Sequence, residues 1–248
     1  ATDSPNFVFP TPSSFNGCYR SFQNCRAITS LDLSGWDVSN LRDIGNQCFQ
    51  FMINLESLNI SNWDLSSITN FSSGLGDLGT STTDGCILIA PNIDVSGSTT
   101  IAKCFFNSAY KSMDIANWTL NATSVSINQC FRGIGSTNSI YNGICTLDIS
   151  TWNNTSSILT NNGSFLFYQA KGLNEIDITN FDFTNVQDFS SIFRDCFHLE
   201  NIKGLESQTW DSATTLSSAF SQTKKLKFDT YNFSNNFGSS WSVRNFSN

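Results

Sequence analysis

The sequence lacks several features that would point to an enzyme or a nucleic-acid-binding protein. It contains one histidine, His198, and none of its eight cysteines forms a Cys-x-x-Cys pair. Only 13% of its 248 residues are charged, and the net charge is -7. Such a composition offers neither a zinc-binding cluster nor a basic patch that could follow a phosphate backbone. We therefore predict no catalytic residues, no metal, no cofactor and no nucleic-acid partner.

Long hydrophobic runs are also missing. No apolar stretch approaches the roughly 20 residues that a membrane-spanning helix needs, so we expect no transmembrane segment. The opening residues Ala1 to Pro10 have neither the basic region nor the long apolar stretch of a signal peptide. A signal removed earlier, another route of export, and assembly into a particle after synthesis in the cytoplasm all remain open.

A repeat is the strongest positive signal. An apolar-x-apolar triplet recurs every 24 to 34 residues, starting at Leu31, Leu58, Ile87, Met113, Leu147, Ile176, near Ile202, and Leu226. Five residues after six of these starts comes an aromatic, at Trp36, Trp63, Trp118, Trp152, Phe181 and Tyr231, and Trp210 lies five residues after Leu205, where the register slips. Nine residues before the triplet lies a Phe or Cys, at Phe22, Phe49, Cys104, Phe167 and Phe193.

Such periodicity predicts an α/β solenoid, because a single coil cannot bury its inward face and stacked coils can. We expect a leucine-rich-repeat right-handed superhelix of about eight coils, with a parallel β-sheet on one wall and irregular or short helical segments on the other. Residues 1–14 form an entry segment, 15–230 the solenoid and 231–248 a C-terminal cap. The Gly-rich stretch Gly133–Asn138 is expected to loop out, and the third coil has Asn92 where an aromatic is expected.

The repeats resemble those of the BspA-type leucine-rich-repeat family. Residues 28–41 read Ile-Thr-Ser-Leu-Asp-Leu-Ser-Gly-Trp-Asp-Val-Ser-Asn-Leu after the segment Phe22-Gln23-Asn24-Cys25, and residues 176–186 repeat the pattern before Phe193-Arg194-Asp195-Cys196. This resemblance covers about residues 15–234. It implies a surface-exposed, non-enzymatic protein used in adhesion or recognition on cells or phage particles, and leaves the ligand open.

The expected outward face of the strands supplies the candidate site, because alternation along a strand sends the middle residue of each triplet away from the core. We predict a partner-binding column of Asp32, Asn59, Asp114, Asp148, Asp177, Lys203 and Lys227, which passes through Leu88 in the third coil and has Cys86 beside it. The alternative is that this column is only the solvated consensus of the repeat. A protein or a glycan is the expected ligand.

Several residue types are expected to be structural. The fixed offset of the aromatics favours a core stack over a sugar-binding strip, and His198 has no expected partner. Buried reduced thiols are favoured for the cysteines, with disulfides between coils through Cys18, Cys86 or Cys145 as the alternative.

Two functions compete at this point. The first is recognition or adhesion at a cell surface or on a virion. The second is a structural virion protein, such as a capsid decoration or tail-associated protein, which the absence of an anchor motif favours. Ice binding and glycan cleavage by Asp148 and Asp177 are weaker alternatives. Open sheet edges would be covered by neighbouring subunits in a homo-oligomer.

Overall fold

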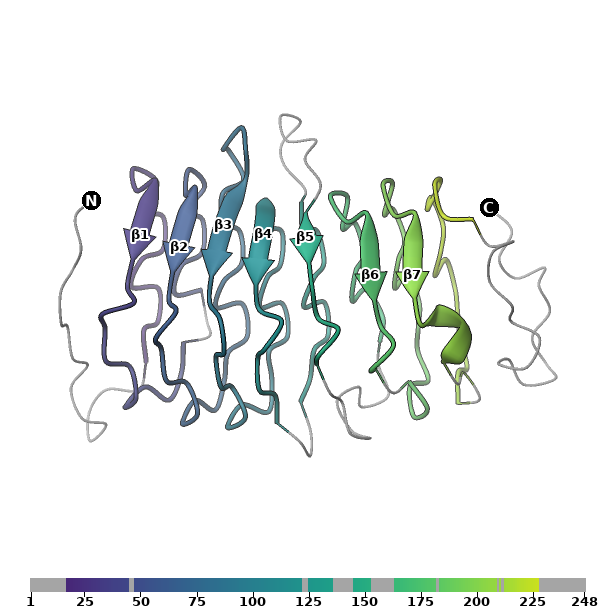
Figure 1. Ribbon diagram of the computed structural model, residues 1–248, viewed down its shortest axis with the longest axis horizontal. Helices are drawn as coiled ribbons and strands as arrows, with labels where there is room; N and C mark the ends of the chain where they lie inside the picture. Colours follow the sequence, from purple (N-terminus) through teal and green to yellow (C-terminus); the bar gives the residue numbers. More distant parts are fainter. Residues whose placement is uncertain are drawn as a thin grey trace.

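The computed structural model is a solenoid in which short strands follow one another along a single axis from the N-terminal to the C-terminal end (Figure 1). It describes residues 17–44, 47–121, 125–135, 145–152, 163–181, 183–208, 210 and 212–227. The expected entry segment 1–14 and cap 231–248 lie outside these residues. Within the described part, no helix has the length and apolar character to cross a membrane.

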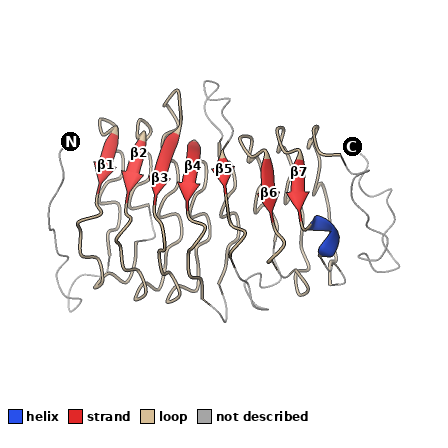
Figure 2. Ribbon diagram, viewed as in Figure 1, coloured by secondary structure: helices blue, strands red, loops and turns tan. Residues whose placement is uncertain are grey.

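In the described part of the chain, seven strands line one wall of the solenoid (Figure 2). They are β1 (Ser30–Asp32), β2 (Ser57–Asn59), β3 (Cys86–Ile89), β4 (Tyr110–Asp114), β5 (Thr146–Leu147), β6 (Glu175–Asp177) and β7 (Asn201–Lys203). The first five form one parallel sheet in chain order, and β6 and β7 form a second parallel sheet.

The solenoid and its parallel sheet confirm the fold prediction, with differences in detail. The expected eighth strand is absent from the described residues, since Leu226 and Lys227 lie outside any strand and Phe228 is not described. The short helical segments expected on the other wall reduce, in the described part, to the single 3-10 helix η1 (Leu205–Ser207).

Hydrogen-bonded turns take the place of those helices. They occupy residues 18–26, 47–53, 73–79, 103–109, 129–135, 165–171, 191–197 and 218–223, which we call the turn wall. Each turn places two residues four apart in the left-handed region, such as Phe165 (φ 60°) and Gln169 (φ 58°). This conformation costs on the order of 1 kcal/mol per non-glycine residue. Hydrogen bonds from coil to coil, such as Phe167 N–H to the Ile192 carbonyl at 2.9 Å, offset that cost.

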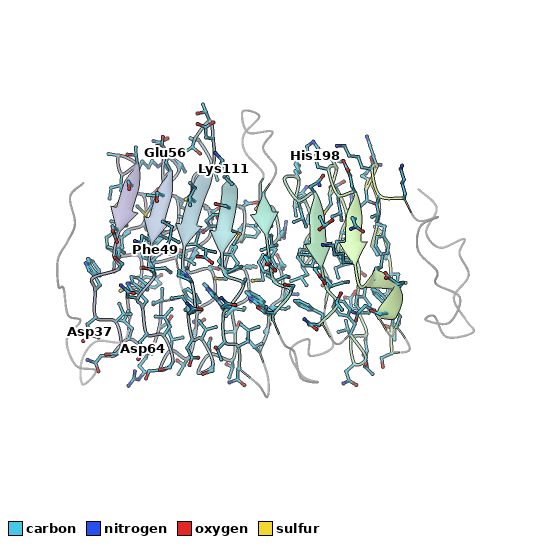
Figure 3. The ribbon with its side chains drawn as sticks, viewed as in Figure 1. Asp37, Phe49, Glu56, Asp64, Lys111 and His198 are labelled. Atoms are coloured by element: carbon cyan, nitrogen blue, oxygen red, sulfur yellow. The ribbon has the colours of Figure 1, made fainter. Side chains whose placement is uncertain are left out.

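A column of stacked phenylalanines fills the core behind the turn wall. Phe131, Phe167 and Phe193 lie 5.4 and 5.2 Å apart between ring centroids, with interplanar angles of 7° and 1°. The stack continues to Phe105 at one end and Phe220 at the other. Phe49, labelled in Figure 3, and Phe22 make the same contact at the N-terminal end. In the fourth coil Phe105 takes this place in the stack, and Cys104, the residue nine before the triplet, is fully buried beside it.

The tryptophans form a second ladder inside the coils, as the fixed spacing predicted. Trp63, Trp118 and Trp152 are each less than 5% exposed. Their indole N–H groups donate to backbone carbonyls of the preceding coil, those of Leu33, Ala90 and Ile115, at 2.7 to 2.8 Å. Each indole therefore joins two coils by packing and by a hydrogen bond.

The Gly-rich stretch of the fifth coil does not loop out at its start. Gly133 takes one of the left-handed positions of the turn wall (φ 75°), and its N–H donates to the Tyr168 carbonyl at 2.8 Å. Ile134 is fully buried. Only the part from Ser136 to Asn138 of the expected insertion falls outside the described residues.

The burial of Asp77 on the turn wall can be tested by measuring how the stability of the protein depends on pH. Desolvation raises the pKa of its buried carboxyl above the ordinary value, although the side chains of Gln50 and Asn107 partly oppose the shift. Because the pKa of Asp77 is higher in the folded than in the unfolded state, the protonated carboxyl contributes fully to stability at a pH below the unfolded-state pKa. This contribution is lost as the pH rises through the folded-state pKa. The ionised group therefore costs stability at neutral pH.

We expect Asp77→Asn to raise the melting temperature at pH 7 by roughly 2 to 4 °C, the effect of about 1 kcal/mol in a domain of this size. Asparagine keeps an acceptor for the Gln50 amide and tolerates the left-handed conformation. The gain should vanish near pH 3, where Asp77 is protonated. Thermal melts across this pH range check the prediction, and a gain that is independent of pH would contradict it.

Candidate interaction surface

The outward face of the five-stranded sheet is a regular array of mostly small and polar side chains. Two rows cross it, because the parallel register aligns equivalent residues of neighbouring strands. One row contains Ser30, Ser57, Ile87 and Ser112, and the other contains Asp32, Asn59, Ile89 and Asp114. Asp148 follows β5, and Asp177 and Lys203 end β6 and β7. Six of the seven predicted site residues therefore lie along the strand wall; Lys227 is exposed but belongs to no strand.

The third coil corrects the predicted column. Leu88 is 1% exposed and Cys86 is fully buried, whereas Ile87 and Ile89 are 40% and 37% exposed. A shift of one residue turns every side chain of a strand to the other face. Residues 86–90 are all apolar, so the triplet could be read in either register. The correct register could have been found from the residue five positions after the start of the triplet, which is aromatic in most coils. The buried Ile93 lies five residues after Leu88, whereas the polar Asn92 lies five residues after Ile87.

The aspartates of this face have a local structural role. Asp32 Oδ1 accepts hydrogen bonds from the Ser34 N–H at 3.0 Å and the Ser34 hydroxyl at 2.7 Å. Asp148 makes the same pair of contacts with Ser150. These bonds lower the pKa of both carboxyls below the ordinary value. The Asp-x-Ser pattern thus fixes the turn that leaves each strand, which gives the alternative interpretation of the column a physical basis.

The same turn recurs one corner further along the first three coils, at Asp37, Asp64 and Asp94. Asp37 and Asp64, labelled in Figure 3, lie on neighbouring coils and accept from the N–H and hydroxyl groups of Ser39 and Ser66. Repetition of a local turn therefore explains most of the aligned carboxylates. Asp114 differs, since Ala116 follows it where the other three aspartates of the column are followed by Ser34, Ser150 or Thr179.

The wall is interrupted between β5 and β6. Among the described residues, the isolated bridge of Cys145 with Leu173 is the one strand-type pairing between these coils, and Figure 1 shows the two strands farther apart than their neighbours. A shallow depression of about 350 Å³ lies there. It is lined by Cys145, Leu147, Asp148, Ser150, Asn174, Glu175, Ile176, Asp177 and Lys203. Three predicted site residues meet in this depression, which we call the sheet-break groove.

Charge in the sheet-break groove is organised around Lys203. Its ammonium lies 2.7 Å from Glu175 Oε1, while the Asn201 amide donates to Glu175 Oε2 at 2.9 Å. Glu175, then Asp177 and Asp148, raise the pKa of Lys203. The pKa of Glu175 is lowered by its bonds to Lys203 and Asn201. Three carboxylates around one ammonium leave the groove with an excess of negative charge.

Other expectations can be compared with the structure. His198 is half-buried, with Nδ1 2.6 Å from the Lys171 carbonyl oxygen. All eight cysteines are free thiols, and burial raises the pKa of Cys86 and Cys145 to about 12. Within the described ranges, no group of three or more His, Cys, Asp or Glu residues is placed to hold a metal ion.

Comparison with known proteins finds a family whose model matches the repeats of this chain. A family model described as "Mycoplasma protein of unknown function, DUF285" matches residues 16–143 and again 99–233. These two matches together span nearly the whole described solenoid. No curated protein and no solved structure matches the chain significantly.

Proposed function

We propose that this chain, which belongs to the DUF285 family described as Mycoplasma proteins of unknown function, recognises a protein partner through the outward face of its sheet and catalyses no reaction. We also propose that the chain is related to the BspA-type leucine-rich-repeat proteins, which residues 28–41 resemble. The proposal also includes display at a cell or virion surface, where such recognition serves adhesion.

One observation carries this proposal. Ile87 and Ile89 project from the middle strand of the five-stranded sheet, 40% and 37% exposed. Their neighbours in the two rows are Ser57 and Ser112 for Ile87, and Asn59 and Asp114 for Ile89. An apolar centre within a polar rim is the usual anatomy of a protein-binding patch. Both isoleucines lie on the same face of β3, so a partner can contact them together.

The charges of the sheet-break groove support a non-catalytic role. A pair of carboxyls that cleaves a glycosidic bond needs one member with a raised pKa to act as the acid. In the groove the pKa values of Asp148 and Glu175 are lowered instead, and Glu175 is occupied by Lys203. These ionised carboxylates suit the rim of a binding face that receives basic side chains.

The double variant Ile87→Ser/Ile89→Ser tests the proposal. Serine is what neighbouring strands carry in the first row, and both isoleucines are partly exposed, so the melting temperature should change little. With the protein fixed on beads and incubated with detergent-solubilised surface proteins of the source cells, we expect this variant to lose at least one protein that wild type retains. Removing two apolar anchors should weaken binding roughly tenfold or more.

Phe51→Asn is the matched control. Phe51 is also an exposed large hydrophobic residue (38%), but it lies on the turn wall at φ 64°, a conformation that asparagine accepts. Quantitative mass spectrometry of the retained proteins compares the three forms. If wild type, the double variant and the control retain the same proteins in the same amounts, the sheet face is not the binding surface.

A further inference from the structure

A separate set of side chains projects from the turn wall. The residue directly after each buried phenylalanine of the stack points outward, and in four successive coils this position holds Phe106, Arg132, Tyr168 and Arg194. Their alignment is fixed by the backbone, because Phe105, Phe131 and Phe167 each donate an N–H to the next coil. Rings and guanidinium groups therefore alternate along the solenoid axis. We call this set the arginine column.

The contacts within the arginine column are regular. The Arg132 guanidinium carbon lies 5.3 Å from the ring centroid of Phe106 and 5.0 Å from that of Tyr168. The same carbon of Arg194 lies 5.8 Å from Tyr168. Phe165 supports the arrangement from the side, 5.4 Å from Tyr168 in an edge-to-face contact. Each residue of the arginine column therefore contacts the next one along the solenoid axis.

This arrangement prepares the two arginines for anions. Rings next to the guanidinium groups restrict their motion, while the five N–H donors of a guanidinium lie in one plane as a rigid fork. Arg132 donates one hydrogen bond to Gln129 Oε1 at 2.8 Å, and Arg194 makes a long ion pair of 3.7 Å with Asp195. Each guanidinium carries five donors, so both retain donors for a forked bond to a carboxylate or sulfate.

The spacing of the charges restricts the ligand. Arg132 and Arg194 are two coils apart, about 10 Å at the separation of hydrogen-bonded strands. DNA carries a charge every ~1.7 Å, and this chain has a net charge of -7, which would repel such a dense polyanion. A polymer with one acidic group on alternate units matches the arginines better.

A protein partner fits this column less well. Among the described residues the exposed large hydrophobic side chains are Tyr19, Phe51, Ile87 and Ile89, and none belongs to the arginine column. The column therefore lacks the apolar centre that a protein interface needs. We propose that the column formed by Phe106, Arg132, Tyr168 and Arg194 binds an acidic polysaccharide lying along the solenoid axis, with its carboxylates or sulfates forked by the two arginines. This inference is independent of the sheet face.

Binding of two acidic polymers tests the inference. Isothermal titration calorimetry at physiological salt would use hyaluronan, which carries carboxylates on alternate sugar units, and κ-carrageenan, which carries sulfates on alternate units, with dextran as the uncharged probe. We expect wild type to bind at least one acidic polymer and not dextran. Arg132→Ala/Arg194→Ala should weaken that binding roughly tenfold or more, since each forked bond is charge-assisted.

Two further variants separate recognition from simple charge. Arg26→Ala/Lys111→Ala also removes two exposed cations, but away from the column, and should bind as wild type does. Arg132→Lys/Arg194→Lys keeps the charge and the fold but loses the planar fork, so it should bind more weakly than wild type. The inference is overturned by three results: neither acidic polymer binds, both alanine pairs weaken binding equally, or single-stranded DNA or a polyglutamate peptide binds more tightly than either polysaccharide.

Discussion

Replacing Phe167 with alanine is expected to lower the free energy of unfolding by about 4 kcal/mol, close to the upper range for buried aromatic truncations. Phe167 is fully buried between Phe131 and Phe193, with near-parallel contacts on both faces. Truncation leaves a cavity and breaks two ring contacts, each of which contributes roughly 0.5 to 1.5 kcal/mol beyond burial. Because each coil contacts only its neighbours, the cavity separates the coils before it from those after it.

The matched control is Phe22→Ala, the same repeat position in the first described coil. Phe22 is half-buried, and among the described residues its one stacked partner is Phe49 at 5.2 Å, with a tilted contact to Trp36 at 5.8 Å. Its loss should cost less than half as much as the loss of Phe167, because it loosens one end of the solenoid without dividing it. Urea unfolding of both variants provides the comparison. Equal losses would mean that the phenylalanine stack is not what stabilises the centre.

Replacing Gly135 with alanine is expected to destabilise the protein by roughly 2 to 4 kcal/mol. Gly135 has φ 66°, and a Cβ placed there would lie 2.5 Å from the Gly172 Cα and 2.8 Å from the Gly172 nitrogen. Both neighbours are backbone atoms, so no side chain can rotate away to relieve the contact. The coils that carry β5 and β6 would have to separate where Gly172 donates its N–H to the Ile134 carbonyl and accepts from the Cys145 N–H.

Gly163→Ala serves as the control for this change. A Cβ at Gly163 would first meet the Val186 Cγ1 atom at 3.3 Å, a side-chain contact that a small movement relieves, and the backbone there is not left-handed. We expect its effect on thermal stability to stay within about 1 kcal/mol. Native-state hydrogen exchange adds a local readout, because Gly135→Ala should speed exchange at Cys145, whose N–H donates to the Gly172 carbonyl. Unchanged exchange at Cys145 would contradict the close approach of these coils.

The repeat in the sequence predicts the sheet well because its information is local. An apolar-x-apolar triplet alternates sides in any short strand, and stacking aligns the triplets. Strands β1, β2, β4 and β6 accordingly lie at Leu31, Leu58, Met113 and Ile176. The prediction failed in register at β3, where residues 86–90 are all apolar and alternation carries no signal.

Two other features could not be found in the sequence pattern. The turn wall depends on left-handed residues as different as Phe165, Gln169 and Ser191, whose conformation is imposed by hydrogen bonds to the next coil and not by residue preference. The sheet-break groove depends on how far β5 and β6 diverge, which no residue type encodes. Asp148, Asp177 and Lys203 were predicted as members of one column, but their meeting around the Glu175–Lys203 ion pair required the structure.

Hydroxyl-radical footprinting of the protein, alone and in complex with the partner retained by wild-type beads, tests the proposed recognition face most directly. Among the described residues Ile87, Ile89, Tyr19 and Phe51 are the exposed large hydrophobic side chains, so each reports on its own part of the surface. We predict that the partner lowers oxidation of Ile87 and Ile89 and leaves Tyr19 and Phe51 unchanged. Unchanged oxidation of both isoleucines in the complex, with protection of Phe51 or Tyr19, would contradict recognition through the sheet face.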